Sequence, residues 1–175
     1  VLGSEIETIS NLLLENKKKY KCFIANDNSN GQIVLSGKIK DLNLLKDDLK
    51  EKSIKNIMLS VSAPFHCELM KKATEIMQKE ILNTEFKNPK NPIISNVTSK
   101  EVSDSNLIKD LLIKQIESPV RWRESIIYII KKGVTKFIEI GPGKVLSGLN
   151  KRIDKNVKTL SINEIEDIEK LSLDD

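Results

Sequence analysis

"KCFIANDNSNGQIVLSG", residues 21–37, is the stretch that decides how the first part of this chain folds. Two short, largely apolar runs flank a cluster of Asn, Asp, Ser and Gly. Such runs favour strands, and the residues between them accept turn conformations. The pattern predicts a β-hairpin with strands over 21–26 and 32–37 and a turn at 27–31.

A helix is predicted on each side of this hairpin. Residues 5–16 repeat apolar side chains at helical spacing, and residues 39–52 place three leucines on one helical face. A further strand is predicted over 54–62. One additional strand in front would complete the βαββαβ ferredoxin-like unit. The chain opens without Met where such a strand would end, so we expect the natural protein to begin earlier.

Strands alternate with helices in the rest of the chain, which indicates an α/β fold with a parallel sheet. Residues 136–153 predict a strand, a tight Gly-Pro-Gly turn and a helix. An acidic tail, 164–175, ends the chain. The other predicted elements are helices over 69–82, 105–119 and 120–133 and a short strand over 93–96.

The composition narrows the class of protein. Hydrophobic residues make up 39% and charged residues 31%, a balance typical of a soluble globular protein. The apolar runs are too short to span a membrane, and no secretory signal opens the chain. Cys22 and Cys67 form neither a metal motif nor a disulfide framework, which favours a reducing cytoplasm. The net charge of +4 comes without an arginine cluster or aromatic ladder, so nucleic-acid binding is disfavoured.

His66 is the one histidine of the chain and follows a proline after a strand-like run. Imidazole is the side chain whose unperturbed pKa allows proton exchange near neutral pH, although a lone histidine is more often structural than catalytic. Gln115 lies near a helix end, where main-chain carbonyls lack intrahelical partners. Such a carbonyl could accept a hydrogen bond from an imidazole N–H, or the segment could simply end a helix. Asn96 could present its amide to a cleft or satisfy its own turn.

"EIGPGKVLSG", residues 139–148, has the glycines of a phosphate-binding loop. The spacing of that motif is absent, because Lys144 is followed by Val145 and not by Ser or Thr. The better interpretation is a strand-to-helix turn that needs the backbone freedom of glycine.

Five blocks, taken together and in this order, carry a resemblance to a known family. The chain resembles the malonyl-CoA:acyl-carrier-protein transacylases of bacterial fatty-acid synthesis, with the acyltransferase domains of polyketide synthases as the nearest neighbours. The resemblance runs over residues 1–163. The blocks are "NSNGQIVLSG", "SAPFHCELM", "NPIISNVTS", "KQIESPVRWRESI" and "FIEIGPGKVLSGLNKRI".

The resemblance implies a fold and a reaction. It implies a ferredoxin-like small subdomain over 1–62, its first strand largely missing, joined to the C-terminal part of an α/β-hydrolase-like subdomain over 63–163. Family members move a malonyl group from malonyl-CoA to the phosphopantetheine thiol of acyl carrier protein, through an acyl-serine and without a cofactor.

The resemblance also assigns residues. His66 matches the general base, and Gln115 matches the position whose main-chain carbonyl holds that imidazole, so the two should lie within hydrogen-bond reach. Asn96 matches an asparagine near the same site. Phe65 is expected to favour malonyl, because a ring beside the base leaves little room for a branched acyl group.

One feature of the family is absent from these residues. No Gly-x-Ser-x-Gly elbow occurs, so the chain holds the base without the nucleophile. We therefore expect the isolated chain to be inactive, and to aggregate or pair with the missing portion through exposed sheet edges. The alternatives are a non-catalytic module that docks an acidic carrier protein and an acyltransferase domain of a polyketide synthase.

Overall fold

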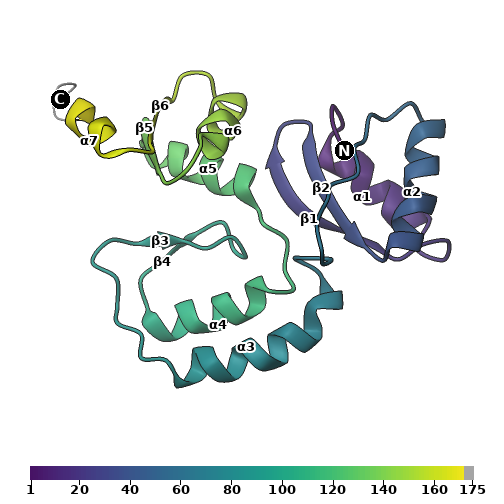
Figure 1. The fold of residues 1–175 in the computed structure, drawn as a ribbon, viewed down its shortest axis with the longest axis horizontal. Helices are drawn as coiled ribbons and strands as arrows, with labels where there is room; N and C mark the ends of the chain where they lie inside the picture. The colour runs from purple at the N-terminus through teal and green to yellow at the C-terminus, as the bar shows by residue number, and fades with distance from the viewer. Residues whose placement is uncertain (172–175) are drawn as a thin grey trace. The chain divides into compact units, whose positions relative to one another are not determined.

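The computed structural model describes residues 1–171, in which two compact units occur (Figure 1). The first unit spans Val1–Ser125 and the second begins at Ile126. The expected subdomain boundary between residues 62 and 63 stays a prediction. Residues 172–175 of the acidic tail lie outside the described residues.

The predicted hairpin is confirmed. Strand β1 (Cys22–Ser29) pairs antiparallel with β2 (Gln32–Gly37). The prediction of a five-residue turn was wrong, because β1 continues through Ser29 and leaves only Asn30 and Gly31 between the strands. An Asn-Gly pair is the preferred sequence of a two-residue hairpin loop, and Gly31 has the positive φ (69°) that such loops use.

Helices α1 (Ile6–Glu15) and α2 (Ile39–Glu51) form where the apolar spacing predicts them. Their inward faces pack with β2 into the core of the first unit. The side chains of this core are almost fully buried, which gives the hairpin the packing partners that an isolated two-stranded ribbon lacks. The core consists of Ile9, Leu12, Tyr20, Ile33, Leu45 and Leu49.

The prediction of a third strand over 54–62 was wrong. Within the described chain only Lys55 pairs, through an isolated antiparallel bridge in which the Leu2 amide donates to the Lys55 oxygen at 2.8 Å. Leu2 forms a second antiparallel bridge with Gln32 at the end of β2. Strand formation needs a neighbouring backbone, and past Lys55 the described residues offer none to this segment. Residues 56–62 are therefore left unpaired beside the hairpin.

Two helices and a short ribbon complete the first unit. A 3₁₀ turn (Glu68–Met70) leads into α3 (Lys71–Asn83), which packs against α4 (Ser105–Gln115) as the two run side by side in Figure 1. Strands β3 (Ile93–Ile94) and β4 (Glu101–Val102) pair antiparallel, so the expectation of a parallel sheet was wrong here.

The second unit is a strand–helix–strand unit with a parallel pair. Helix α5 (Trp122–Lys131) starts in the first unit and continues into the second. Strand β5 (Lys136–Ile140), helix α6 (Val145–Ile153) and strand β6 (Lys158–Ile162) follow, and β5 and β6 pair in parallel. The strand, turn and helix predicted over 136–153 are confirmed, whereas β6 and helix α7 (Ile165–Leu171) were missed. The whole is a mixed α/β fold.

Candidate active site

His66 lies in the irregular segment between residues 56–62 and the 3₁₀ turn, and its backbone is in the left-handed region with φ of 60°. Few non-glycine residues adopt this conformation, and those that do often lie at functional sites. The neighbouring residues hold it in place. The Ser36 hydroxyl on β2 donates to the Phe65 oxygen at 2.7 Å, and the Cys67 thiol donates to the Pro64 oxygen at 3.1 Å.

Gln115, the last residue of α4, presents its main-chain oxygen to the imidazole. The His66 Nδ1 atom lies 3.3 Å from that oxygen, within the hydrogen-bond reach that the family resemblance implies. A carbonyl oxygen can only accept, so in this contact Nδ1 carries a proton, and in the neutral ring Nε2 is then the acceptor. The Gln115 side chain has another task, because its Nε2 donates to the Ser118 oxygen at 3.0 Å and closes the turn after α4.

The imidazole borders two hollows in the first unit. A larger hollow of about 530 Å³ is lined mainly by apolar side chains of β2, of α2 and of Ile57, Met58, Leu59 and Val61. Phe65, whose side chain is 45% exposed, lines this hollow beside His66. A smaller hollow of about 420 Å³ is lined by residues of β1 and by His66, Glu68 and Glu117. His66 is therefore half-buried but reachable, as a proton-transferring group must be.

Asn96 lies apart from these hollows. It belongs to the turn between β3 and β4, and its main-chain oxygen accepts a hydrogen bond from the Arg121 amide at 3.4 Å. Its side chain lines neither of the two hollows that His66 borders. Its place near the substrate thus stays a prediction.

The two thiols of the chain are poor nucleophiles. Burial raises the pKa of Cys67, whose side chain is almost fully enclosed. Burial likewise raises the pKa of Cys22 to about 12. Both groups are therefore protonated near neutral pH, and the thiolate is the form that attacks. His66 consequently has no cysteine nucleophile to activate among the described residues.

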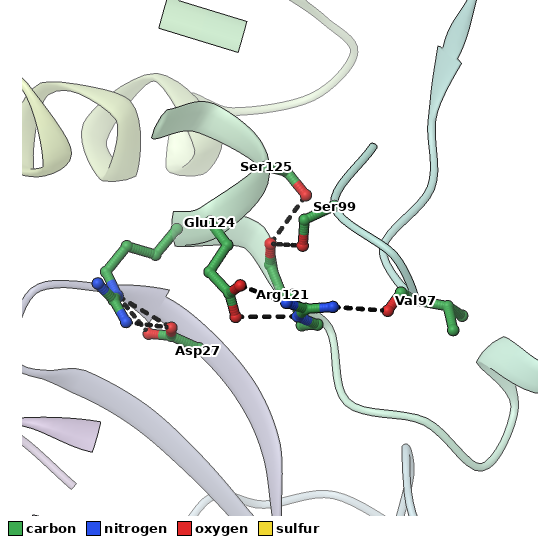
Figure 2. A network of polar contacts seen from close by, with 7 residues as sticks. Asp27, Val97, Ser99, Arg121, Glu124 and Ser125 are labelled. Atoms are coloured by element: carbon green, nitrogen blue, oxygen red, sulfur yellow. Dashed lines mark hydrogen bonds and ion pairs between the residues drawn. The ribbon is translucent and has the colours of Figure 1, made fainter. Parts of the chain in front are cut away.

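A polar network at the start of α5 escaped the sequence analysis (Figure 2). The Arg121 guanidinium pairs with Glu124 and donates to the Val97 oxygen at 3.0 Å, and the Arg121 oxygen accepts from the Ser125 hydroxyl at 2.8 Å. Arg123 pairs with Asp27 on β1. A usable signal was present, because a chain with many lysines places two of its three arginines on either side of its one tryptophan.

The Gly-Pro-Gly turn between β5 and α6 is confirmed as a strand-to-helix turn. Gly141 and Gly143 both have positive φ, at 133° and 91°. The Glu139 carboxylate accepts from the Leu146 amide at 3.0 Å and from the Ser147 amide at 2.7 Å. A carboxylate of the chain itself thus occupies the anion-binding end of α6, where a phosphate would otherwise bind.

Two further features of the described residues bear on function. Among residues 1–171, His, Cys, Asp and Glu side chains form no group of three or more that could hold a metal ion. No helix within the same residues is long and apolar enough to cross a membrane.

Comparisons with known proteins identify relatives of this chain, although no family model matches it. It is 46% identical over 147 residues to the malonyl CoA-acyl carrier protein transacylase of Bacillus subtilis (strain 168), which covers 83% of this chain and 46% of that protein. It is 43% identical over 145 residues to the protein of the same name from Staphylococcus aureus (strain MSSA476), with 82% and 47% covered. The chain thus spans about half the length of the curated relatives it matches.

Solved structures give the same result. The acyl-carrier-protein S-malonyltransferase of Bartonella henselae superposes with a TM-score of 0.93 at 38% identity, over 98% of this chain and 55% of that one. A chain in the structure of a type II polyketide synthase acyl-carrier protein in complex with its malonyl-transacylase superposes with a TM-score of 0.93 at 31% identity, over 100% of this chain and 57% of that one.

Proposed function

Because the chain belongs to the malonyl CoA-acyl carrier protein transacylase family, we propose that the protein that carries it transfers a malonyl group from malonyl-CoA to acyl carrier protein. The acceptor is the phosphopantetheine thiol of the carrier, and the reaction belongs to fatty-acid biosynthesis in the cytoplasm. The observation that carries this proposal is the contact between His66 Nδ1 and the Gln115 oxygen. It leaves Nε2 of the chain's one histidine free to take a proton.

In the proposed reaction, His66 moves the protons of two successive acyl transfers. Nε2 takes the hydroxyl proton of a serine outside these 175 residues while that oxygen attacks the thioester carbonyl. The carbon–sulfur bond breaks, and the coenzyme A sulfur takes that proton from Nε2 and leaves as the thiol. The carrier thiol then gives its proton to Nε2 and attacks the acyl-serine, and the serine oxygen recovers that proton as its bond to carbon breaks.

The Gln115 carbonyl is proposed to replace the carboxylate of a Ser-His-Asp triad. A carboxylate in that position holds the imidazole in one tautomer and stabilises the imidazolium that forms. A neutral carbonyl also selects the tautomer, because it accepts only from a protonated Nδ1. It stabilises the imidazolium less than a full negative charge does, which suits a base that must return its proton in each half-reaction.

Acyl choice is proposed to depend on Phe65, which precedes the base and lines the larger hollow beside it. A ring in that place fills the space that a methyl branch on the acyl α-carbon would need. We therefore propose malonyl, not methylmalonyl, as the preferred group. One methyl group in an apolar pocket is worth only about 1–3 kcal/mol, so the preference is bounded.

The architecture is proposed to be that of a ferredoxin-like subdomain joined to part of an α/β-hydrolase-like subdomain. Leu2 supports the first part, since it bridges Gln32 on one side and Lys55 on the other, both antiparallel. The central strand of a βαββαβ sheet pairs with its two neighbours in this way. Strand β5 and helix α6 support the second part, as a parallel strand–turn–helix unit.

The test uses the full-length protein with malonyl-CoA and holo acyl carrier protein, and mass spectrometry of the carrier as the readout. The unmodified protein should convert the carrier to its malonyl form, and His66→Gln should lower the rate by about a hundredfold or more. Lys40→Gln, a change at an exposed position on α2, should leave the rate unchanged. Normal transfer by His66→Gln would contradict the assignment of the base.

A non-catalytic module that binds carrier protein is the second candidate. The observation that favours it is the lack of a Gly-x-Ser-x-Gly elbow in these 175 residues. The two functions separate in one experiment, because a binding module would retain the carrier protein on a sensor surface but never form an acyl-serine.

A further inference from the structure

The two partners of the contact between His66 and Gln115 are both attached to the β1–β2 hairpin. On the histidine side, the Ser36 hydroxyl of β2 donates to the Phe65 oxygen at 2.7 Å. On the glutamine side, Val120 forms a parallel bridge with Asn26 of β1, in which its amide donates to the Ala25 oxygen at 2.8 Å. The hairpin is thus the common support of the imidazole and of the carbonyl that orients it.

A charged pair strengthens the second attachment. The Asp27 amide donates to the Val120 oxygen at 2.9 Å, and the Asp27 carboxylate accepts from Arg123 Nε at 3.0 and 2.9 Å. Arg123 Nη2 lies 2.9 Å from the same carboxylate. Figure 2 shows Asp27 on β1 with this two-pronged contact drawn as dashed lines. A fork-like contact of this kind sets both position and orientation.

Burial makes the pair costly to break. The Asp27 side chain is only 4% exposed and that of Arg123 is 22% exposed. Removing one partner of a buried ion pair leaves an uncompensated charge, so the surrounding backbone must shift or admit water. Strand β1 and the start of α5, 96 residues apart in the sequence, are therefore held at one distance.

The segment between Gln115 and Arg123 is short and held at both ends. The Gln115 side chain closes its first turn by donating a hydrogen bond to the Ser118 oxygen. Pro119 then restricts the backbone that follows. Loss of the ion pair at Arg123 would therefore loosen one end of the segment that carries the Gln115 carbonyl. The contact it would disturb is sensitive, because 3.3 Å is already at the long end of the hydrogen-bond range.

We propose that Asp27 and Arg123 are positioning residues for His66. Their ion pair holds the segment after α4 against β1, which keeps the Gln115 oxygen at hydrogen-bond distance from Nδ1 and so selects the neutral tautomer whose proton is on Nδ1. The catalytic consequence rests on the proposed function, whereas the structural consequence, one imidazole tautomer, does not. An imidazole without this partner would populate both tautomers.

The experiment reads the tautomer directly. The full-length protein that carries this chain is labelled with ¹⁵N in its histidine rings, and the His66 signals are those that vanish in His66→Gln. At a pH where the ring is neutral, the unaltered protein should show Nδ1 protonated and Nε2 unprotonated. Asp27→Asn should move both nitrogen shifts toward their tautomer-averaged values, and Arg123→Lys, which keeps the charge but loses the fork, should move them part of the way.

Asp48→Asn is the matched control. Asp48 on α2 is also a buried carboxylate, 7% exposed as a residue, and pairs with Lys19 in the turn before β1. This variant makes the same chemical change in another ion pair of the same unit. It should lower the melting temperature without moving the His66 shifts. Equal movement in Asp48→Asn and Asp27→Asn would overturn the proposal, because it would show a general loosening.

Unchanged His66 shifts in a folded Asp27→Asn protein would also overturn the proposal. Should that variant not fold, Arg123→Lys decides by the same shifts. In the transfer assay, Asp27→Asn should lower kcat by about tenfold with the KM for malonyl-CoA unchanged, because a misplaced base affects the chemical step. If the unaltered protein transfers no malonyl group, the proposed function fails, and the tautomer measurement still decides this inference.

Discussion

The Ser36 hydroxyl donates a 2.7 Å hydrogen bond to the main-chain oxygen of Phe65, and so joins the C-terminal end of β2 to the residue before His66. Ser36 is buried, and the sequence separation is 29 residues. The left-handed backbone of His66 begins directly after this contact. A strained conformation persists only where its surroundings over-determine it, so the hydroxyl is part of what keeps the imidazole in place.

Ser36→Ala is therefore expected to affect both stability and activity. Loss of one partly buried hydrogen bond should lower the free energy of unfolding by about 1 kcal/mol, measured by urea titration. The rate of malonyl transfer should fall by more than the lost stability explains, because the backbone of His66 is no longer held in one conformation. Ser60→Ala, at an exposed position, is the control and should change neither quantity. A transfer rate equal to that of the unaltered protein would show that the contact does not hold the base.

Two substitutions at Gln115 distinguish the role of its side chain from the role of its main-chain carbonyl. Gln115→Ala removes only the hydrogen bond to the Ser118 oxygen and should cost about 1 kcal/mol of stability with a modest loss of transfer. Gln115→Pro removes an amide N–H in the last turn of α4 and should cost about 3 kcal/mol or more, with transfer abolished. Equal losses of transfer in the two variants would mean that the side chain, not the carbonyl, serves His66.

Phe65→Ser tests acyl choice in the full-length protein. The ring is half-exposed in the larger hollow, so the change should open space beside His66 without unfolding the protein. In a competition between malonyl-CoA and methylmalonyl-CoA, the preference for malonyl should relax by no more than about a hundredfold. An unchanged product ratio would place specificity elsewhere in the protein.

The hydrogen bonds of the Glu139 carboxylate lead us to expect that the stability of the second unit falls in acid. Burial acts to raise the pKa of this carboxyl, but the hydrogen bonds from the Ser147 and Leu146 amides outweigh it and hold the pKa below the ordinary value of 4.5. The stability that these bonds contribute is therefore present above pH 4.5 and lost as the pH falls through the lower folded value. The protection factors of the Leu146 and Ser147 amides, which compare each exchange rate with that of an unfolded amide at the same pH, should fall below that pH. In Glu139→Gln these protection factors should already be low at neutral pH and vary less with acid.

The unpaired segment after α2 predicts self-association of the isolated 175-residue chain. Ile57, Leu59 and Val61 alternate along it and are 63%, 53% and 64% exposed, a pattern that invites pairing with another strand. Leu59→Lys should lower the association constant in analytical ultracentrifugation. Leu14→Lys makes the same change at a 65% exposed leucine of α1 and should leave association unaltered. A monodisperse, cooperatively melting chain would contradict the prediction.

Local patterns in the sequence were sufficient for the elements whose signals lie within a few residues. Two apolar runs around the Asn, Asp, Ser and Gly cluster at 27–31 predicted the hairpin, although only the pairing of Ser29 with Gln32 showed how short its loop is. Leucine spacing located α2, and the glycines around Pro142 located the turn before α6. The resemblance directed attention to His66 and to the carbonyl of Gln115, and the 3.3 Å contact agrees with it.

Tertiary structure alone decided the features that need a distant partner. Residues 54–62 have the composition of a strand, but a strand forms only beside another backbone, and among the described residues only Leu2 pairs with this segment. Strand β6 pairs with β5 across an intervening helix, so its partner lies outside the local stretch of sequence in which it occurs. The Asp27–Arg123 pair joins residues 96 positions apart. Propensity and spacing act over one or two turns of chain, whereas which charge becomes buried against which depends on how the elements pack.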